Sequence, residues 1–134
     1  MFSRTITIVS LLLTLSTTAF AQQGDQARHK YFFRAVYTAE GMKDLQRRSA
    51  TALRAGVQKF DESAGCKLEA WYFDYTESAN YGFVDCPDEI AMATISATAN
   101  AAGFVRVTFR PVLTPEEMDK VLARSVATRP PQQQ

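Results

Sequence analysis

Four segments of the chain are rich in aromatic and branched residues and alternate apolar with polar positions, as β-strands do. The predicted strands lie at 30–38, 66–75, 80–86 and 104–112. Between and after them, apolar residues recur at the three- and four-residue spacing of an amphipathic helix. This spacing predicts helices over 40–65, 88–103 and 113–127.

Residues that favour helix ends mark the boundaries of these helices. Thr38 is expected to cap the first helix at its N-terminus, and Gly65 is expected to end it. Pro87 suits the first turn of the second helix, because the N–H that proline lacks has no partner there. Thr114 and Glu117 match a capping box at the start of the third helix.

The predicted order of elements is β-α-β-β-α-β followed by one more helix, which is the ferredoxin-like arrangement. We therefore expect an α+β fold in which an antiparallel sheet carries helices on one face. The domain is expected to span 30–127. Disordered segments are expected at 22–29 and 128–134, where Gln is concentrated.

The first 21 residues differ from the rest of the chain. Arg4 is followed by a short apolar run, and small residues, Ala19 and Ala21, stand at the two positions that a signal peptidase reads. The run is shorter than the roughly 20 residues that a membrane span needs. The pattern predicts a signal peptide cut after Ala21, and a periplasmic or secreted protein that does not stay in the membrane after cleavage. An uncleaved membrane anchor is the alternative.

Charge and composition narrow the range of partners. The chain has 15 Lys and Arg against 14 Asp and Glu, and cleavage after Ala21 would remove Arg4 and balance the two. A nucleic-acid partner is not expected, because it would need a basic excess. The single histidine, His29, cannot form a multi-histidine metal site, and no phosphate-binding loop or nucleophile elbow occurs. We therefore expect neither a metal nor a cofactor.

Alternation along the strands assigns side chains to two faces of the sheet. The set expected to meet the helices is apolar and often small: Phe33, Ala35, Leu68, Ala70, Tyr72, Gly82, Val84, Val105 and Val107. The other set is aromatic and charged: Phe32, Arg34, Val36, Glu69, Trp71, Phe73, Tyr81, Phe83, Phe104 and Arg106. A face in water should not carry so many aromatic residues, so something is expected to cover it.

A second copy of the chain is the economical cover, because a homodimer packed sheet on sheet buries one self-complementary patch twice. The C-terminal helix and a small hydrophobic or anionic ligand are the alternatives. For a ligand, the candidate cleft residues are Arg34, Glu69, Trp71, Tyr81, Phe83 and Arg106. The competing interpretation is that Glu69 pairs with one of the two arginines inside a dimer interface.

The only two cysteines bracket the predicted hairpin. A hairpin centred on Thr76 places Cys66 opposite Cys86 and Trp71 opposite Tyr81. Directly opposed residues have Cβ atoms about 4.5–5.5 Å apart, close to the distance that a disulfide spans. In an oxidising compartment this spacing favours a structural disulfide, with two buried free thiols as the alternative.

Two segments give the chain a family resemblance. The segments YTAEG at 37–41 and LTPEE at 113–117 resemble those of the GYD domain family, small ferredoxin-like proteins related to the dimeric α/β barrels. The resemblance covers nearly the whole predicted domain and implies the fold and a dimer, but no particular activity. The chain departs from the family in the hairpin, where ESANYG at 77–82 replaces the Gly-Tyr-Asp motif.

The sequence thus predicts an exported, homodimeric α+β domain that serves as a binding or interaction module. The alternative is a cofactor-independent enzyme of the dimeric-barrel type that acts on a small hydrophobic or aromatic compound. A structural protein of the cell envelope is the third hypothesis.

Overall fold

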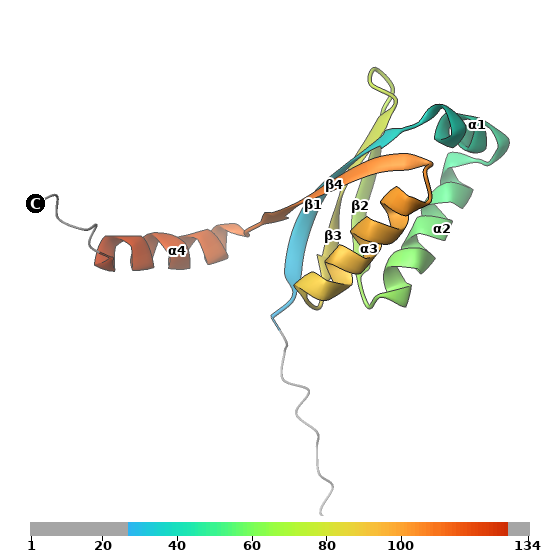
Figure 1. Ribbon diagram of the computed structural model, residues 1–134. Coiled ribbons are helices and arrows are strands. Elements are labelled where there is room, and N and C mark those ends of the chain that lie inside the picture. The colour runs from blue at the N-terminus through green and yellow to red at the C-terminus, as the bar shows by residue number, and fades with distance from the viewer. Residues whose placement is uncertain (1–26, 129–134) are drawn as a thin grey trace, which may run out of the picture.

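The computed structural model describes residues 27–128. The predicted signal peptide and nearly all of the predicted C-terminal tail lie outside these residues. Eight regular elements follow one another along the described chain (Figure 1): β1 (His29–Tyr37), α1 (Ala39–Arg47), α2 (Ala50–Ser63), β2 (Lys67–Asp74), β3 (Ala79–Cys86), α3 (Glu89–Ala101), β4 (Val105–Val112) and α4 (Pro115–Ala127).

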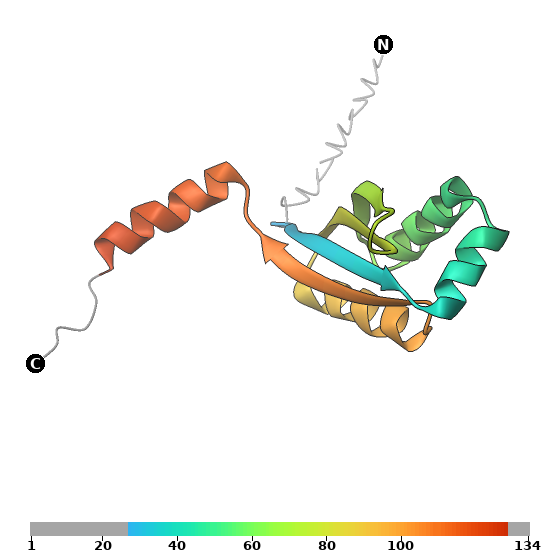
Figure 2. The same cartoon turned by 90° about the horizontal axis from the view of Figure 1, so that it is seen from above.

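The four strands form one sheet in the order β2-β3-β1-β4, and every neighbouring pair is antiparallel. Helices α2 and α3 lie against one face of this sheet, and α1 lies beyond one end of it (Figures 1 and 2). Two βαβ halves therefore place their helices on the same side. The predicted α+β, ferredoxin-like fold is confirmed.

The segment predicted as one helix over 40–65 contains two helices. Arg48 interrupts them with an extended backbone, at φ −103° and ψ 160°. Ser49 then caps α2, because its hydroxyl oxygen accepts a hydrogen bond from the Ala52 amide at 3.1 Å. The preference of serine for the cap position outweighs the helical spacing of the apolar residues on either side.

The remaining helix starts agree with the sequence, with one shift. Thr38 caps α1, and the capping box of Thr114 and Glu117 opens α4, as predicted. Pro87 is not in the first turn of α3, because Asp88 caps that helix and Pro87 precedes the cap. Each helix start is therefore satisfied by a side chain from the adjoining segment.

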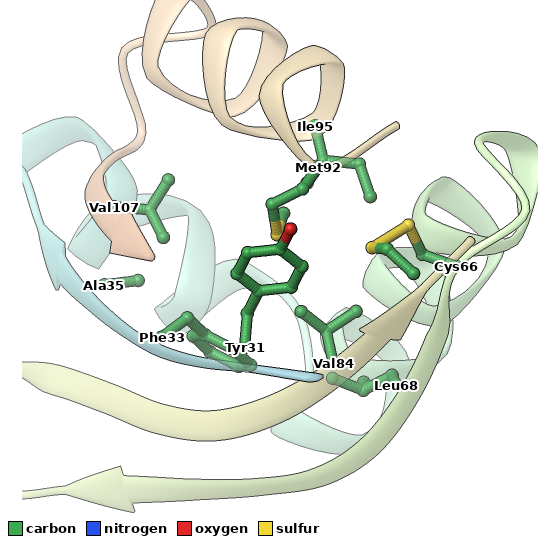
Figure 3. Packing of buried hydrophobic residues seen from close by; sticks show 10 residues of the cluster. Tyr31, Phe33, Ala35, Cys66, Leu68, Val84, Met92, Ile95 and Val107 are labelled. Carbon is green, nitrogen blue, oxygen red and sulfur yellow. A yellow bond between two sulfur atoms is a disulfide. The ribbon is translucent and has the colours of Figure 1, made fainter. Parts of the chain in front are cut away.

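The hydrophobic core lies between the sheet and the helices. Side chains of the strands point toward Met92 and Ile95 of α3 (Figure 3). The buried apolar residues are Tyr31, Phe33, Ala35, Cys66, Leu68, Val84, Cys86, Met92, Ile95 and Val107. The faces predicted for Phe33 and Ala35 on β1 and for Val107 on β4 are confirmed.

Cys66 and Cys86 form a disulfide at the base of the β2–β3 hairpin, with their Cα atoms 4.2 Å apart. Both residues are buried in the core. The predicted pairing is confirmed, and the strands adjoin it in the predicted register, with Leu68 opposite Val84.

The predicted register fails beyond Leu68, because β2 contains a bulge between Leu68 and Ala70. A bulge sets two residues of one strand against one of its partner, so every later side chain changes face relative to simple alternation. Trp71 consequently pairs with Gly82 and not with Tyr81. The prediction that Trp71 faces away from the helices is wrong, and Trp71 lines a cavity beneath them.

The bulge also reverses the predicted faces of three neighbours of Trp71. Phe73 pairs with the buried Asn80 on the helix side. Ala70 and Tyr72 pair with Phe83 and Tyr81 on the side away from the helices, and Tyr72 is 70% exposed there. The predictions that Ala70 and Tyr72 meet the helices, and that Phe73 does not, are therefore wrong.

We call the side of the sheet away from the helices the open face. Its residues are Lys30, Phe32, Arg34, Val36, Glu69, Ala70, Tyr72, Tyr81, Phe83, Arg106, Thr108 and Arg110. Within residues 27–128 no helix covers this face (Figure 2).

Helix α4 projects beyond the end of β4, has no buried residue, and does not return to its own sheet (Figure 1). Among the described helices, none has the length and apolar character needed to cross a membrane.

Candidate functional site

A cavity of about 460 Å³ lies between the sheet and helices α1, α2 and α3. Its walls are largely apolar and include Phe33, Val57, Phe60, Ile95 and Val107. The volume lies within the range of roughly 300–1,000 Å³ that is typical of small-molecule sites. The helix-covered side of the sheet therefore combines a packed core with room for a ligand.

Small residues on the helices account for this space. Gly56 of α2, Ala99 of α3 and Ala102 at the end of α3 line the cavity, and none of them has a side chain long enough to reach the sheet. A Cβ atom added at Gly56 would meet no other atom within 4 Å. On the sheet side, Phe33 lines the cavity, and its ring lies over Gly82, where an added Cβ would be 2.6 Å from that ring.

A row of aromatic rings forms one end of the cavity. Tyr37 and Phe73 stack with their ring centroids 6.3 Å apart and an angle of 10° between planes. Phe73 in turn contacts Trp71, at 5.2 Å between centroids. Trp71 and Tyr37 line the cavity and offer aromatic surface to a ligand, and Phe73 stacks between them.

Two polar atoms beside this row are buried without a hydrogen-bond partner among residues 27–128: Nε1 of Trp71 and Oδ1 of Asn80. Asn80 is only 3% exposed, and its Nδ2 donates to the hydroxyl oxygen of Tyr37 at 2.8 Å. Burial raises the pKa of Tyr37 despite this hydrogen bond, so the phenol keeps its proton at neutral pH. Trp71 and Asn80 both line the cavity, and each thus keeps one buried polar atom without a partner, which is uncommon for buried groups.

A carboxyl group also lines the cavity. Asp61 of α2 is 4% exposed, and no hydrogen bond from the described residues reaches its side chain. Burial, with a smaller contribution from the charge of Glu62, raises the pKa of Asp61 to about 7. The backbone oxygen of Asp61 accepts a hydrogen bond from the Cys66 amide at 2.9 Å, which fixes the residue beside the disulfide.

The six residues predicted as a cleft are not brought together. Trp71 lies in the cavity, whereas the other five, Arg34, Glu69, Tyr81, Phe83 and Arg106, belong to the open face. The prediction grouped them because simple alternation does not include the bulge at Glu69.

Two ion pairs lie on the open face, one at Arg34 and one at Lys30. Arg34 contacts Glu77 at 2.6 Å and donates a hydrogen bond to the Tyr81 hydroxyl at 3.2 Å. The hydrogen bond from Arg34 lowers the pKa of Glu77, so this carboxylate stays ionised. Within the chain Glu69 pairs with Lys30. Its predicted pairing with an arginine inside a dimer interface stays a prediction.

Three cavity residues, Tyr37, Asp61 and Asn80, were not among the predicted site residues. Asp61 carried a signal that could have been used, since it lies four residues after Val57 and three before Ala64 on the apolar side of the helix. Asn80 carried a weaker one, as a polar residue within an aromatic strand. Neither signal indicates a cavity, because empty space depends on how far the helices stand from the sheet.

The fold and this site define the class of the protein: a ferredoxin-like α+β domain with a largely apolar internal cavity. The profile of the GYD domain matches residues 31–122, which include every cavity residue discussed above. The chain therefore belongs to the GYD domain family. No curated protein and no solved structure shows significant similarity to it.

Proposed function

We propose that the protein is a binding module whose cavity takes a small, largely apolar molecule with one group that both donates and accepts a hydrogen bond. A hydroxyl group or a protonated carboxylic acid has this character. The observation that carries the proposal is the pair of unpartnered atoms, Trp71 Nε1 and Asn80 Oδ1, in two residues that line a largely apolar cavity.

Energetics support this assignment. Leaving a buried donor or acceptor without a partner costs about 1–3 kcal/mol. A ligand hydroxyl that accepts from Trp71 and donates to Asn80 would remove both costs. Its apolar part would gain about 25 cal/mol for each Å² of surface that leaves water. Both contributions favour an amphiphilic ligand over a plain hydrocarbon of equal size.

The experiment uses Trp71 as a reporter, because it is the only tryptophan in the chain. A 4-alkylphenol and the alkylbenzene of equal chain length are each titrated while the indole emission is recorded. We expect a saturable change with both, and binding of the phenol about five- to tenfold tighter, since one hydrogen bond contributes about 1 kcal/mol net. No saturable change with either compound would contradict the proposal.

Substitutions locate the site. In the Asn80→Leu variant, the preference for the phenol should fall while the alkylbenzene still binds. Calorimetry on Trp71→Phe should also show a smaller preference. Tyr72→Ala changes the neighbour of Trp71 that points to the open face and is the matched control, for which the preference should be unchanged. Equal preference in all variants would place the ligand elsewhere.

We also propose that the protein is exported and works in the periplasm or outside the cell. The apolar leader before Ala21 and the disulfide between Cys66 and Cys86 support this location, because structural disulfides persist in oxidising compartments. Intact mass spectrometry of protein from the extracellular and periplasmic fractions tests it. A chain that starts at Gln22 and lacks two hydrogens is expected, and a full-length reduced chain confined to the cytosol would contradict export.

The buried carboxyl group of Asp61 supports a second candidate function, that of a cofactor-independent enzyme that moves a proton on a bound apolar compound. A carboxyl group whose pKa is about 7 can serve as acid and base near neutral pH. NMR in D2O would detect exchange of acidic C–H protons in enolisable aromatic ketones. For this candidate, Asp61→Asn should abolish exchange and leave ligand binding intact, and exchange that persists in the variant would exclude Asp61.

A further inference from the structure

Helix α4 has an exposed apolar stripe. Its members recur at helical spacing and are exposed by 43% at Met118, 44% at Val121, 50% at Leu122 and 87% at Val126. A helix of this length is only marginally stable in water unless its apolar side packs against something. The stripe therefore needs a packing partner, and the described part of its own chain does not supply one.

The open face carries a matching apolar surface. Phe32 lies at its centre, with ring centroids 6.0 Å from Tyr81 and 5.7 Å from Phe83. Phe83 is 38% exposed and Tyr72 is 70% exposed. Antiparallel sheets tolerate one wet face when that face is polar, and this one has an aromatic centre.

The charges on the two surfaces are complementary. Arg106 and Arg110 lie on the open face of β4, and neither forms an ion pair with any residue of 27–128. In α4, Asp119 adjoins the apolar stripe, whereas Lys120 and Arg124 lie on the opposite side by helical spacing. An α4 stripe laid on the aromatic centre would therefore bring Asp119, and not the basic residues of the helix, toward the arginines.

Direct packing of two open faces lacks this complementarity. Glu69 and Glu77 are already engaged by Lys30 and Arg34 within each chain. Two such faces in contact would bury their β4 arginines without free carboxylates, and an unpaired buried charge is costly.

The geometry at the end of β4 sends α4 away from its own sheet. Only Leu113 and Thr114 connect the strand to the helix, and Thr114 is extended and held by the capping box (Figure 1). With a rise of about 1.5 Å per residue, α4 is about 20 Å long, shorter than an eight-residue strand of about 26 Å, so it fits within the length of the open face. We propose that α4 of one copy lies across the open face of a second copy, and that the exchange is reciprocal.

Sedimentation and native mass spectrometry of the chain from Gln22 onward test the proposal. A dimer is expected. Leu122→Asp, in the stripe, and Phe83→Asp, on the open face, should each raise the dissociation constant of the dimer by at least about tenfold. Lys120→Asp introduces the same residue on the opposite side of α4 and serves as the control, which should remain dimeric.

Mixing the two disruptive variants gives the decisive result. A mixed dimer of Leu122→Asp with Phe83→Asp keeps one intact contact between an unaltered α4 and an unaltered open face. It should therefore form more readily than either variant dimerises alone. A monomeric wild-type chain, or Leu122→Asp dimers as stable as the wild type, would overturn the proposal. The Trp71 titration is unaffected by either outcome, so this inference and the proposed function fail separately.

Discussion

The two faces of the sheet contain similar numbers of aromatic residues but treat their polar groups in opposite ways. On the open face, where water has access, Arg34 pairs with Glu77 at 2.6 Å and Lys30 pairs with Glu69. Under the helices, Trp71 and Asn80 each keep a buried atom without a partner, and the Asp61 carboxyl group is enclosed. Leaving the buried atoms without partners costs more free energy than leaving exposed charges unpaired, because water solvates the exposed charges.

This difference separates the roles of the two faces. The enclosed side has directional groups around a space of ligand size, which suits selective binding of a small molecule. The open side has a broad aromatic centre with charges at its margins, which is the usual anatomy of a protein–protein interface. The predictions below test the contrast, starting with the largest expected effect.

Loss of the disulfide, which lies on the helix-covered side of the sheet, should lower the free energy of unfolding most. The bond joins residues 20 positions apart, and a loop of this length contributes about 3 kcal/mol to the free energy of unfolding. We expect Cys66→Ala with Cys86→Ala to lower the denaturant midpoint accordingly. Treatment with reductant should lower the midpoint of the wild type to the same level and leave the double variant unchanged. Equal midpoints for wild type and double variant would refute this.

Gly82→Ala should cost about 2–3 kcal/mol of unfolding free energy. The added Cβ would lie 2.0 Å from the Ala70 carbonyl oxygen and 2.6 Å from the Phe33 ring. Gly56→Ala is the control, because its Cβ meets nothing within 4 Å and alanine favours helix by about 1 kcal/mol. Thermal unfolding should therefore shift down for the first variant and up for the second. Similar shifts for both would show that the close contact at Gly82 is unimportant.

Asp61 should make the protein less stable as pH rises. Its pKa is raised from 3.8 to about 7, so between these values the unfolded chain releases a proton that the folded chain retains. The full linkage value for this pKa change is about 4 kcal/mol, and partial access of solvent to the carboxyl group reduces it, so the free energy of unfolding should fall by about 2 kcal/mol over this interval and level off above it. Asp61→Asn should remove this slope, whereas Glu62→Gln should retain most of it. Chemical denaturation at several pH values measures both.

The smallest effect is expected on the open face. Glu77→Gln removes the partner of Arg34, but both side chains are largely exposed, at 53% and 41%. The denaturant midpoint of the monomer should stay within experimental error of the wild type at low and at high salt. A clear, salt-dependent loss of stability would mean that this pair is more important to the fold than its exposure indicates.

Much of the architecture could be predicted from local patterns. The strand and helix order, the cap at Thr38, the capping box at Thr114 and the pairing of Cys66 with Cys86 all follow from residue types at fixed spacing. Each of these features depends on interactions within or between a few neighbouring residues. Such signals are strong enough to define the fold before any tertiary contact is known.

The errors in assigning side chains to the two faces have one physical origin, the addition of a single residue to a repeating pattern. Glu69 lies in an apolar-polar alternation over 67–70, and the aromatic run that follows over 71–73 fits either face, so the sequence does not reveal the bulge. Its effect on the site is large, because Trp71 moves from the open face to the cavity. The cavity itself could not be predicted. It arises where small residues, Gly56, Ala99 and Ala102, face the sheet across a gap, and the gap depends on tertiary packing.

The disulfide has a consequence for the timing of function. Cys66 donates its amide hydrogen to the backbone of Asp61, so the covalent link also anchors the end of α2 that forms one wall of the cavity. A newly made chain in a reducing environment lacks this anchor. We therefore expect ligand binding to depend on the disulfide, so that the chain becomes competent to bind only once the two cysteines are oxidised.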